Sequence, residues 1–347
     1  MGHDVPVPSP RPLLEACRVP SPPPPEDVVS TRRTVRSGGP AARTPLSRRG
    51  FLAGGAAVLA AGLAACGDRT SLVAAAPSGS TGRLSIGAIP DQDPEVLQRL
   101  YRTVADSMSG ALDLDVAYQP VTDYAAAVSL FRTGDLDLVW FGGLTGVQAR
   151  LQTPGARPLA QRDIDADFHS IFVVNTATGL PPSEDLTPLA GLRFTYGSET
   201  STSGRLMPAY FLQEQGVDPA GFPGGPGFSG SHDATLALVA SGSYQAGVLN
   251  EQVWTARSEE GAVDPAVVRY SRTPAYYDYH WLLGPQATER LGEELPGRLT
   301  GYFTGLSADD PADAEVLDLF GAGAFIPTEA GNYDRIEQIG RRLGLIS

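Results

Sequence analysis

The sequence contains no lysine, only two cysteines and only four histidines in 347 residues. Its 26 basic residues are therefore all arginine, and 39 acids outnumber them to give a formal charge of −13. Recognition of DNA or RNA requires a basic surface, so this balance argues against a nucleic-acid partner. A small anion would have to be held by local backbone dipoles and hydroxyl groups, because the overall field of the protein is negative.

Motifs of metal and cofactor chemistry are also missing. The sequence has no His-Glu-x-x-His, no Cys-x-x-Cys, no Gly-x-x-x-x-Gly-Lys-Ser loop and no Gly-x-Ser-x-Gly nucleophile elbow. These absences predict that the protein holds no resident metal or cofactor and is not an enzyme.

The front of the chain predicts export. Residues 1–46 are rich in proline, serine, arginine and glycine, with too little apolar material for a core, which predicts a disordered N-terminal extension. Residues 47–65 begin with a serine and the pair Arg48-Arg49 and continue as an uncharged run of small and apolar residues. This pattern resembles a twin-arginine signal peptide.

The residue after this run is Cys66, in a Leu-Ala-Ala-Cys sequence that resembles the lipobox of bacterial lipoproteins. We therefore predict that Cys66 becomes the lipidated first residue and that residues 66–82 form a flexible tether. The exported chain would be anchored to the outer face of the cytoplasmic membrane, or be periplasmic. Because Cys17 lies upstream of the signal, no disulfide could form. The exported chain would hold 18 arginines against 35 acids, a formal charge of −17.

Strands and helices alternate in the body of the chain. Strands are predicted over residues 83–90, 114–119 and 136–141, with helices between them that begin near Asp93 and Thr122. This order is typical of a parallel sheet, in which ligands bind at the carboxyl ends of the strands.

Four consecutive hydroxyl residues, Thr200 to Ser203, precede an apolar helical run over residues 206–212. Their hydroxyl groups and the unpaired N–H groups of the first helical turn could together hold an oxyanion without a cationic side chain. The alternative is an ordinary helix N-cap, for which serine and threonine are the usual residues.

Three motifs in this order resemble a known family. They are Thr122-Asp123-Tyr124, the run from Asp135 to Gly142, and Ser201-Thr202-Ser203-Gly204 with Pro208. Together they resemble the phosphate/phosphite/phosphonate-binding receptors of ABC transporters, over about residues 84–343. Residues 123–128 and 142–150 are most similar to the branch labelled selenate-binding.

The resemblance implies an α/β fold of two lobes, the type 2 periplasmic-binding-protein fold, with two crossovers between the lobes. Lobe 1 would comprise residues 83–171 and 275–347, and lobe 2 residues 172–274. Residues 169–175 would form the first crossover, and the segment around 273–283 the second.

The resemblance also implies the ligand-binding residues. They are Tyr124, Phe141, Gly142, His169, Ser201, Thr202, Ser203, His232 and Asp278. In this family Asp278 would accept a proton from the ligand, which favours phosphorus oxyanions with an acidic O–H over selenate or sulfate. Aminoalkylphosphonate receptors carry an acid for the ammonium group near the position of Glu251, and the sequence leaves the orientation of Glu251 open.

These observations predict an extracytoplasmic, monomeric receptor that closes on a small tetrahedral oxyanion and passes it to an ABC permease. Two alternatives remain. One is a receptor for a small organic anion, such as a sulfonate or a thiamine precursor. The other is a hydrolase with Ser203, His232 and Asp278 as a catalytic triad, since such triads are formed in space and not in sequence.

Overall fold

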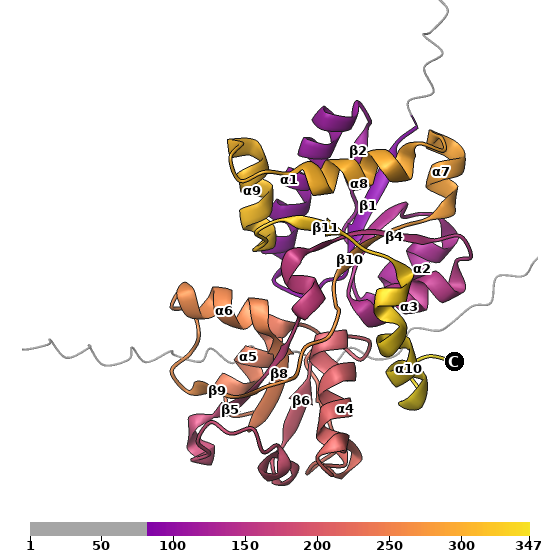
Figure 1. The fold of residues 1–347 in the computed structure, drawn as a ribbon. Coiled ribbons are helices and arrows are strands. Elements are labelled where there is room, and N and C mark those ends of the chain that lie inside the picture. The colour runs from indigo at the N-terminus through magenta and orange to yellow at the C-terminus, as the bar shows by residue number, and fades with distance from the viewer. Residues whose placement is uncertain (1–81) are drawn as a thin grey trace, which may run out of the picture. The chain divides into compact units, whose positions relative to one another are not determined.

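The computed structural model describes residues 82–347, which belong to one compact unit. The predicted disordered extension, signal peptide, lipidated Cys66 and most of the tether lie outside the described residues. Within the described part, no helix is both long enough and apolar enough to span a bilayer. Figure 1 shows two groups of elements, each built around its own sheet.

The first lobe contains a six-stranded sheet in the order β11-β4-β10-β3-β1-β2. Its strands are β1 (Leu84–Ala88), β2 (Val116–Tyr118), β3 (Leu138–Phe141), β4 (Arg157–Arg162), β10 (His280–Leu283) and β11 (Phe325–Pro327). Strand β1 pairs in parallel with β2 and β3, as the alternation of strands and helices predicts. Strand β10, which returns from the other lobe, inserts antiparallel between β3 and β4.

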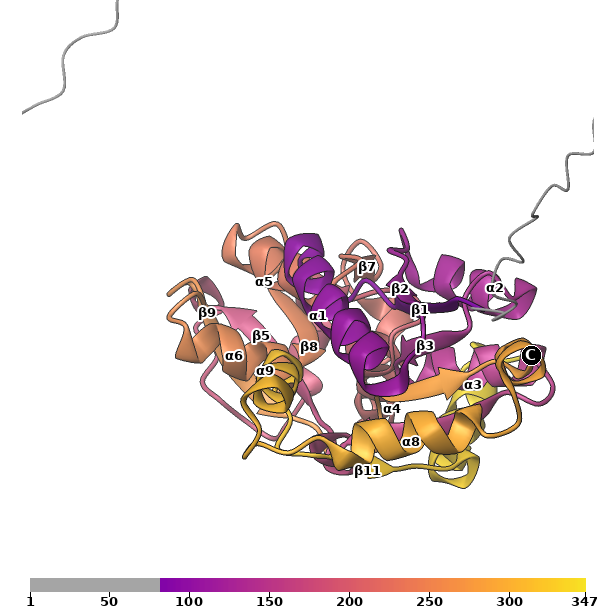
Figure 2. The same ribbon diagram turned by 90° about the horizontal axis from the view of Figure 1, so that it is seen from above.

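Seven helices accompany this sheet among the described residues. They are α1 (Pro94–Leu112), α2 (Tyr124–Thr133), α3 (Gly143–Gln152), α7 (Pro285–Leu291), α8 (Leu295–Gly305), α9 (Pro311–Phe320) and α10 (Asp334–Arg342). Asp93 caps α1 by accepting hydrogen bonds from the backbone nitrogens of Glu95 and Val96, so the predicted helix start is confirmed. Helices α1 and α8 pack against the first sheet, and α9 packs against α1 (Figure 2).

The second lobe contains a five-stranded sheet in the order β7-β6-β8-β5-β9. Its elements are β5 (Ser170–Asn175), β6 (Phe194–Tyr196), α4 (Met207–Glu214), β7 (Gly227–Phe228), α5 (His232–Ala240), β8 (Ala246–Asn250), α6 (Glu251–Glu259) and β9 (Val267–Arg272). This lobe also has short 3-10 helices at Thr176–Thr178, Thr187–Gly191 and Pro219–Gly221, and two more lie outside it, at Asp163–Asp167 and Ala330–Tyr333. Strand β5 runs antiparallel to both neighbours, whereas β6 pairs in parallel with β7 and β8.

Two chain segments connect the lobes. The chain leaves the first sheet after β4 and enters the second at β5, and it returns between β9 and β10. A single β-bridge between Phe168 and Tyr276 holds the two connecting segments side by side. The lobe boundary placed at residue 171 falls inside β5, because all of β5 pairs with strands of the second sheet.

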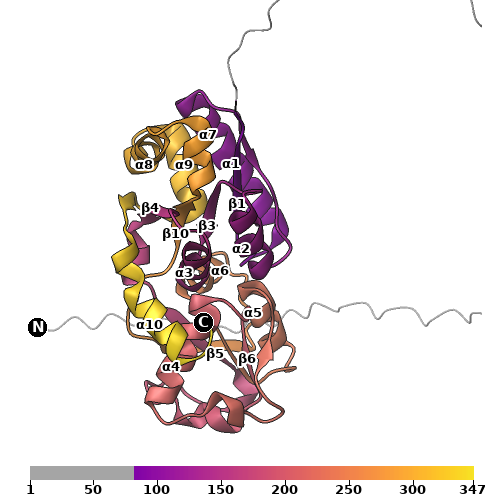
Figure 3. The same ribbon diagram turned by 90° about the vertical axis from the view of Figure 1, so that its right-hand side faces the viewer.

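Helix α10 contacts both lobes. It packs against α3 of the first lobe and against α4 of the second, and Figure 3 shows it beside both. On the first lobe, Arg150 and Glu337 form an ion pair at 3.0 Å. On the second, Arg342 pairs with Glu214 at 3.2 Å and lies over the ring of Tyr210.

Candidate functional site

The predicted hydroxyl segment lies at the start of the helix in the second lobe. Residues Thr202–Leu206 form a π-helical turn that continues into α4. The Ser201 hydroxyl accepts a hydrogen bond from the backbone nitrogen of Gly204 at 2.9 Å, so Ser201 performs the capping role that the alternative interpretation gave it. Ser201, Thr202 and Ser203 are all buried.

Thr202 and Asp278 meet the first turn of α3, which belongs to the other lobe. The Thr202 hydroxyl accepts from the backbone nitrogen of Leu144 at 2.9 Å, and Asp278 Oδ1 accepts from that of Gly143 at 2.8 Å. A Cβ atom on Gly142 would lie 3.2 Å from both acceptor oxygens. Glycine at position 142 therefore permits this close approach of the two lobes.

Five of the predicted residues carry a buried polar atom that has no hydrogen-bond partner within the described chain. One is His169 Nε2, in the connecting segments, and the other four are Tyr124 Oη, Ser203 Oγ, His232 Nδ1 and Asp278 Oδ2. Buried polar groups are almost always paired, and leaving one unpaired costs roughly 1–3 kcal/mol. These four atoms come from both lobes and from the returning segment. They are donors and acceptors that a bound anion with an acidic proton can satisfy.

Tyr124 stands at the first position of α2 and is 2% exposed. Burial and the negative charge of Asp91 raise the pKa of the Tyr124 phenol well above its usual value, while the nearby Ser201 hydroxyl lowers it. The phenol therefore keeps its proton at neutral pH and acts as a hydrogen-bond donor. Tyr124 and Ser201 lie in different lobes, so this neighbourhood exists only when the lobes are together.

Asp278 lies in the returning segment and is 1% exposed. Burial raises the pKa of its carboxyl group to about 7, against the opposing effect of the Gly143 N–H and the Thr202 and Ser203 hydroxyls. The group is thus poised to hold or share a proton near neutral pH.

A second polar cluster, which the sequence did not reveal, is centred on Tyr279. Its hydroxyl donates to Asp91 Oδ2 at 2.8 Å, accepts from Asn250 Nδ2 at 3.0 Å and lies 3.4 Å from His232 Nε2. The backbone nitrogen of His232 also donates to the carbonyl of Asp91 at 2.9 Å. Asp91 comes shortly after strand β1, and Asn250 is the last residue of β8. The expectation that sites lie at strand ends could therefore have pointed to both residues.

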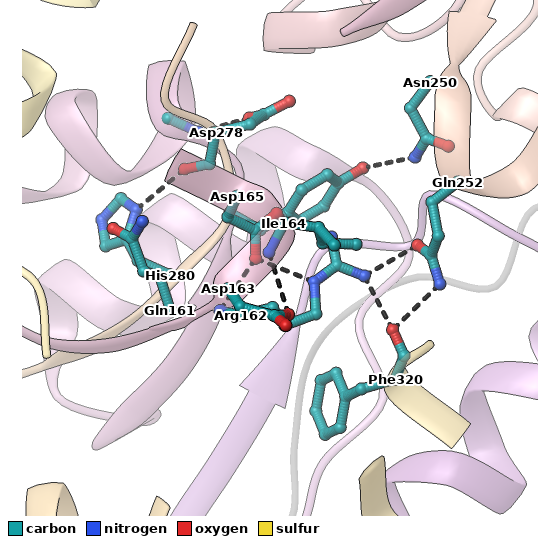
Figure 4. Close-up of polar contacts among 12 residues, drawn as sticks. Gln161, Arg162, Asp163, Ile164, Asp165, Asn250, Gln252, Asp278, His280 and Phe320 are labelled. Carbon is teal, nitrogen blue, oxygen red and sulfur yellow. Dashed lines mark hydrogen bonds and ion pairs between the residues drawn. The ribbon is translucent and has the colours of Figure 1, made fainter. Parts of the chain in front are cut away.

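Arg162, at the end of β4, is buried behind this cluster (Figure 4). It forms two hydrogen bonds to the Asp165 carboxylate, at 2.8 and 2.7 Å. It also donates to Gln252 Oε1 at 2.7 Å and to the carbonyl of Phe320 at 2.9 Å, which connects α6 of the second lobe to the first lobe. All of these contacts are internal, so Arg162 supports the site and its charge is neutralised by Asp165.

Two predicted residues lie in other surroundings. Phe141 is fully buried at the end of β3, with its ring 5.6 Å from that of Phe131. His169 Nδ1 lies 2.7 Å from the carbonyl of Thr273, and its Nε2 lies 3.7 Å from Asp167, so both contacts are to the connecting segments. Within residues 82–347, neither residue forms a hydrogen bond with Tyr124, Ser203, His232 or Asp278.

Glu251 is paired with a surface arginine. Both of its carboxylate oxygens accept from the Arg272 guanidinium, each at 2.6 Å. This carboxylate is therefore engaged by Arg272 and is not free to receive an ammonium group.

The hydrolase alternative lacks its central contact. Ser203 Oγ and His232 Nδ1 each have no partner, and His232 Nε2 contacts only Tyr279, so the required hydrogen bond between nucleophile and base is missing. No group of three His, Cys, Asp or Glu residues able to hold a metal occurs within residues 82–347.

Comparison with known proteins gives a consistent result. The sequence model of the family described as "ABC transporter, phosphonate, periplasmic substrate-binding protein" matches residues 86–333. A probable ABC transporter phosphite binding protein, PhnD1, from Prochlorococcus marinus strain MIT 9301 is 47% identical over 268 residues, covering 76% of this chain and 90% of that protein.

Solved structures show the same fold. PhnD1 of Prochlorococcus marinus in complex with methylphosphonate superposes with a TM-score of 0.75, covering 77% of this chain and all of that one. A binding-protein component of an ABC phosphonate transporter from Pseudomonas aeruginosa, 19% identical, gives a TM-score of 0.65, covering 74% of this chain and 85% of that one. The predicted two-lobed periplasmic-binding-protein fold is therefore confirmed.

Proposed function

Because this chain belongs to the family of periplasmic substrate-binding proteins of phosphonate ABC transporters, we propose that it captures phosphite or a small phosphonate outside the cytoplasm and delivers it to an ABC permease. Members of this family are receptors and not enzymes, in agreement with the prediction from the missing motifs. The relatives described above concern phosphite and phosphonates and do not address selenate.

The observation that carries the proposal is the set of unpartnered buried atoms on Tyr124, Ser203, His232 and Asp278. The phenol and the serine hydroxyl can donate to the oxygens of an anion, and the carboxylate can share a proton with it. A PhnD1 protein 47% identical to this chain binds methylphosphonate. A tetrahedral phosphorus oxyanion matches this combination of donors and acceptors.

Asp278 is the basis for proposing phosphorus over sulfur or selenium. A carboxylate that faces a fully deprotonated anion in a buried site is repelled by it, and the penalty is on the order of several kcal/mol. Phosphite and phosphonates keep one acidic O–H near neutral pH, whereas sulfate, selenate and sulfonates do not. The alternative of a small organic anion draws no support from these contacts.

Three further features belong to the proposal. Lipidation of Cys66 would anchor the receptor at the membrane, the protein would act as a monomer, and the lobes would close around the ligand. The first two rest on the sequence alone. The third draws on the contacts that Thr202 and Asp278 make with the start of α3.

Calorimetric titration tests the proposal directly. We expect methylphosphonate, phosphite and phosphate to bind, and the two protonless anions sulfate and selenate to bind much more weakly above neutral pH, where Asp278 is ionised. An Asp278→Asn variant should lose much of the preference for phosphorus anions, because a neutral amide does not repel a fully deprotonated anion. Binding of selenate as tightly as of methylphosphonate by the unmodified protein would contradict the proposal.

A further inference from the structure

The hydrogen-bond directions around Tyr279 can be worked out from its neighbours. Asn250 Oδ1 accepts from the backbone nitrogen of Val253 at 2.7 Å, where it caps α6. The amide of Asn250 is therefore oriented with its Nδ2 toward Tyr279, and a nitrogen of this kind only donates. The oxygen of Tyr279 accepts this hydrogen bond and has one proton of its own to give.

That proton goes to Asp91. An ionised carboxylate only accepts, and its Oδ2 lies 2.8 Å from the Tyr279 hydroxyl. Burial raises the pKa of Asp91 to about 6, while Tyr279 and Arg162 lower it, so the group is ionised above neutral pH. The other charged groups that act on this cluster are Asp233, which raises the pKa of Asp91, and Asp278, which raises the pKa of Tyr124 and of Tyr279. Asp91 in turn raises the pKa of Tyr101 and of Tyr118.

His232 has then only one way to interact with Tyr279. Because the tyrosine proton is directed to Asp91, the contact of 3.4 Å requires His232 Nε2 to be the donor. Burial lowers the pKa of His232 to about 4, against the effect of Asp233, so the imidazole is neutral and carries a single proton. Its Nδ1 is left with a free lone pair, and this atom is buried and unpartnered.

We propose that Asp91, acting through Tyr279, is a positioning residue that holds His232 as the Nε2–H tautomer and makes its Nδ1 a hydrogen-bond acceptor for the acidic hydroxyl of the bound phosphorus oxyanion. This inference rests on the proposed function. The ligand's one acidic proton can then go to Nδ1, from the second lobe, or to Asp278 Oδ2, from the returning segment. When His232 accepts it, Asp278, whose pKa is raised to about 7, keeps a proton of its own and donates to another ligand oxygen. The receptor therefore selects its ligand in a protonated form.

Nitrogen-15 NMR of the full chain labelled at histidine reads the tautomer directly. His169 and His280 serve as internal references, because each directs Nδ1 at a backbone carbonyl, which only accepts. At roughly pH 8, above the pKa of Asp91, we expect Nδ1–H for both references and Nε2–H for His232. A His232→Gln variant identifies the signal, and spectra are recorded with and without methylphosphonate.

Two variants separate positioning from mere structural support. Asp91→Asn allows residue 91 to donate, so the Tyr279 proton can turn to His232, and a population of the Nδ1–H tautomer should appear with roughly tenfold weaker methylphosphonate binding. Asp93→Asn, in the same loop, is the matched control, since asparagine caps α1 equally well and both readings should stay unchanged. If Asp91→Asn does not fold, Tyr279→Phe removes the same hydrogen-bonded connection, and an Nδ1–H population of His232 should appear in that variant.

The outcomes distinguish the two proposals. An Nδ1–H signal for His232 in the unmodified protein overturns the inference even if methylphosphonate binds. The inference is also overturned if Asp91→Asn and Tyr279→Phe change neither the His232 tautomer nor the affinity for methylphosphonate. Failure of methylphosphonate and phosphite to bind would instead overturn the proposed function, and with it the ligand half of this inference.

Discussion

The hydroxyl oxygen of Thr202 accepts a hydrogen bond from the backbone nitrogen of Leu144 at 2.9 Å, across the two lobes. The acceptor comes from the turn before α4, and the donor is in the first turn of α3. A helix N-terminus carries partial positive charge and N–H groups without partners in the helix. One lobe thus supplies a cap for a helix of the other, which makes the start of α3 sensitive to closure.

Thr202→Val should weaken closure. Valine has the shape of threonine but leaves the Leu144 N–H unpaired in the closed protein, at about 1–3 kcal/mol. We expect a corresponding loss of methylphosphonate affinity and a larger radius of gyration in small-angle X-ray scattering at the same ligand concentration. Thr304→Val, on the exposed surface of α8, is the control and should leave both measurements unchanged.

Tyr124→Phe should reduce binding without harming the fold. The phenol has no partner in the protein, so its removal breaks no internal hydrogen bond. A hydrogen bond to a charged ligand contributes about 1.5–3 kcal/mol, and this is the expected loss in calorimetry. Tyr196→Phe is matched, because the Tyr196 hydroxyl is also buried and unpartnered but comes from β6. Equal affinity losses in the two variants would argue against a ligand contact by Tyr124.

The stability of the ligand-free protein should depend on pH through Asp278. Burial raises the pKa of its carboxyl group from 3.8 to about 7. Between these pH values the folded protein keeps a proton that the unfolded chain has lost, so the free energy of unfolding falls as the pH rises. Denaturant titrations across this range should show the fall, and Asp278→Asn should remove most of it.

Asp91 adds a smaller effect of the same sign. The pKa of Asp91 is raised from 3.8 to about 6, so its part of the fall in the free energy of unfolding is complete at a lower pH than the part due to Asp278. This smaller fall should remain in the Asp278→Asn variant. Asp318→Asn, on the exposed side of α9, serves as the control. If the free energy of unfolding of the unmodified protein does not change over this pH range, neither carboxyl group is buried in solution as it is in the structure.

An amino group on the ligand should bring no gain in affinity. The carboxylate of Glu251 is held by Arg272 through two hydrogen bonds of 2.6 Å and is not free to receive an ammonium ion. We therefore expect 2-aminoethylphosphonate to bind no more tightly than ethylphosphonate in competition calorimetry. Tighter binding of the amine that Glu251→Gln abolishes would show that this ion pair opens.

The sequence revealed the residues that lie within short motifs. The Ser201 to Ser203 segment was predicted because a helix start has a local signature, and it lies at such a start in the structure. Tyr124 came from the family pattern, and it stands at the first position of α2. Phe141 and His169 also came from the family pattern alone, and neither forms a hydrogen bond, within the described residues, with Tyr124, Ser203, His232 or Asp278.

The cluster around Tyr279 could not be read from the sequence. The hydrogen bond from Tyr279 to Asp91 joins residues 188 positions apart, and the bond from Asn250 crosses the lobes. Such pairs leave no periodic pattern, because they depend on how the connecting segments bring the two sheets together. For a similar reason β5 was assigned to the crossover, since an apolar run looks the same in a buried strand and in a link between lobes.

Helix α10 contacts both lobes, and a label placed on it could report how far apart they are. Its Glu337 forms an ion pair with Arg150 of α3. Its Arg342 pairs with Glu214 of α4 and lies over the ring of Tyr210. An environment-sensitive fluorophore attached at position 342 would therefore change its emission when the lobes separate. The receptor could then be turned into an optical sensor for dissolved phosphorus compounds, read in seawater or soil extracts without any coupled assay.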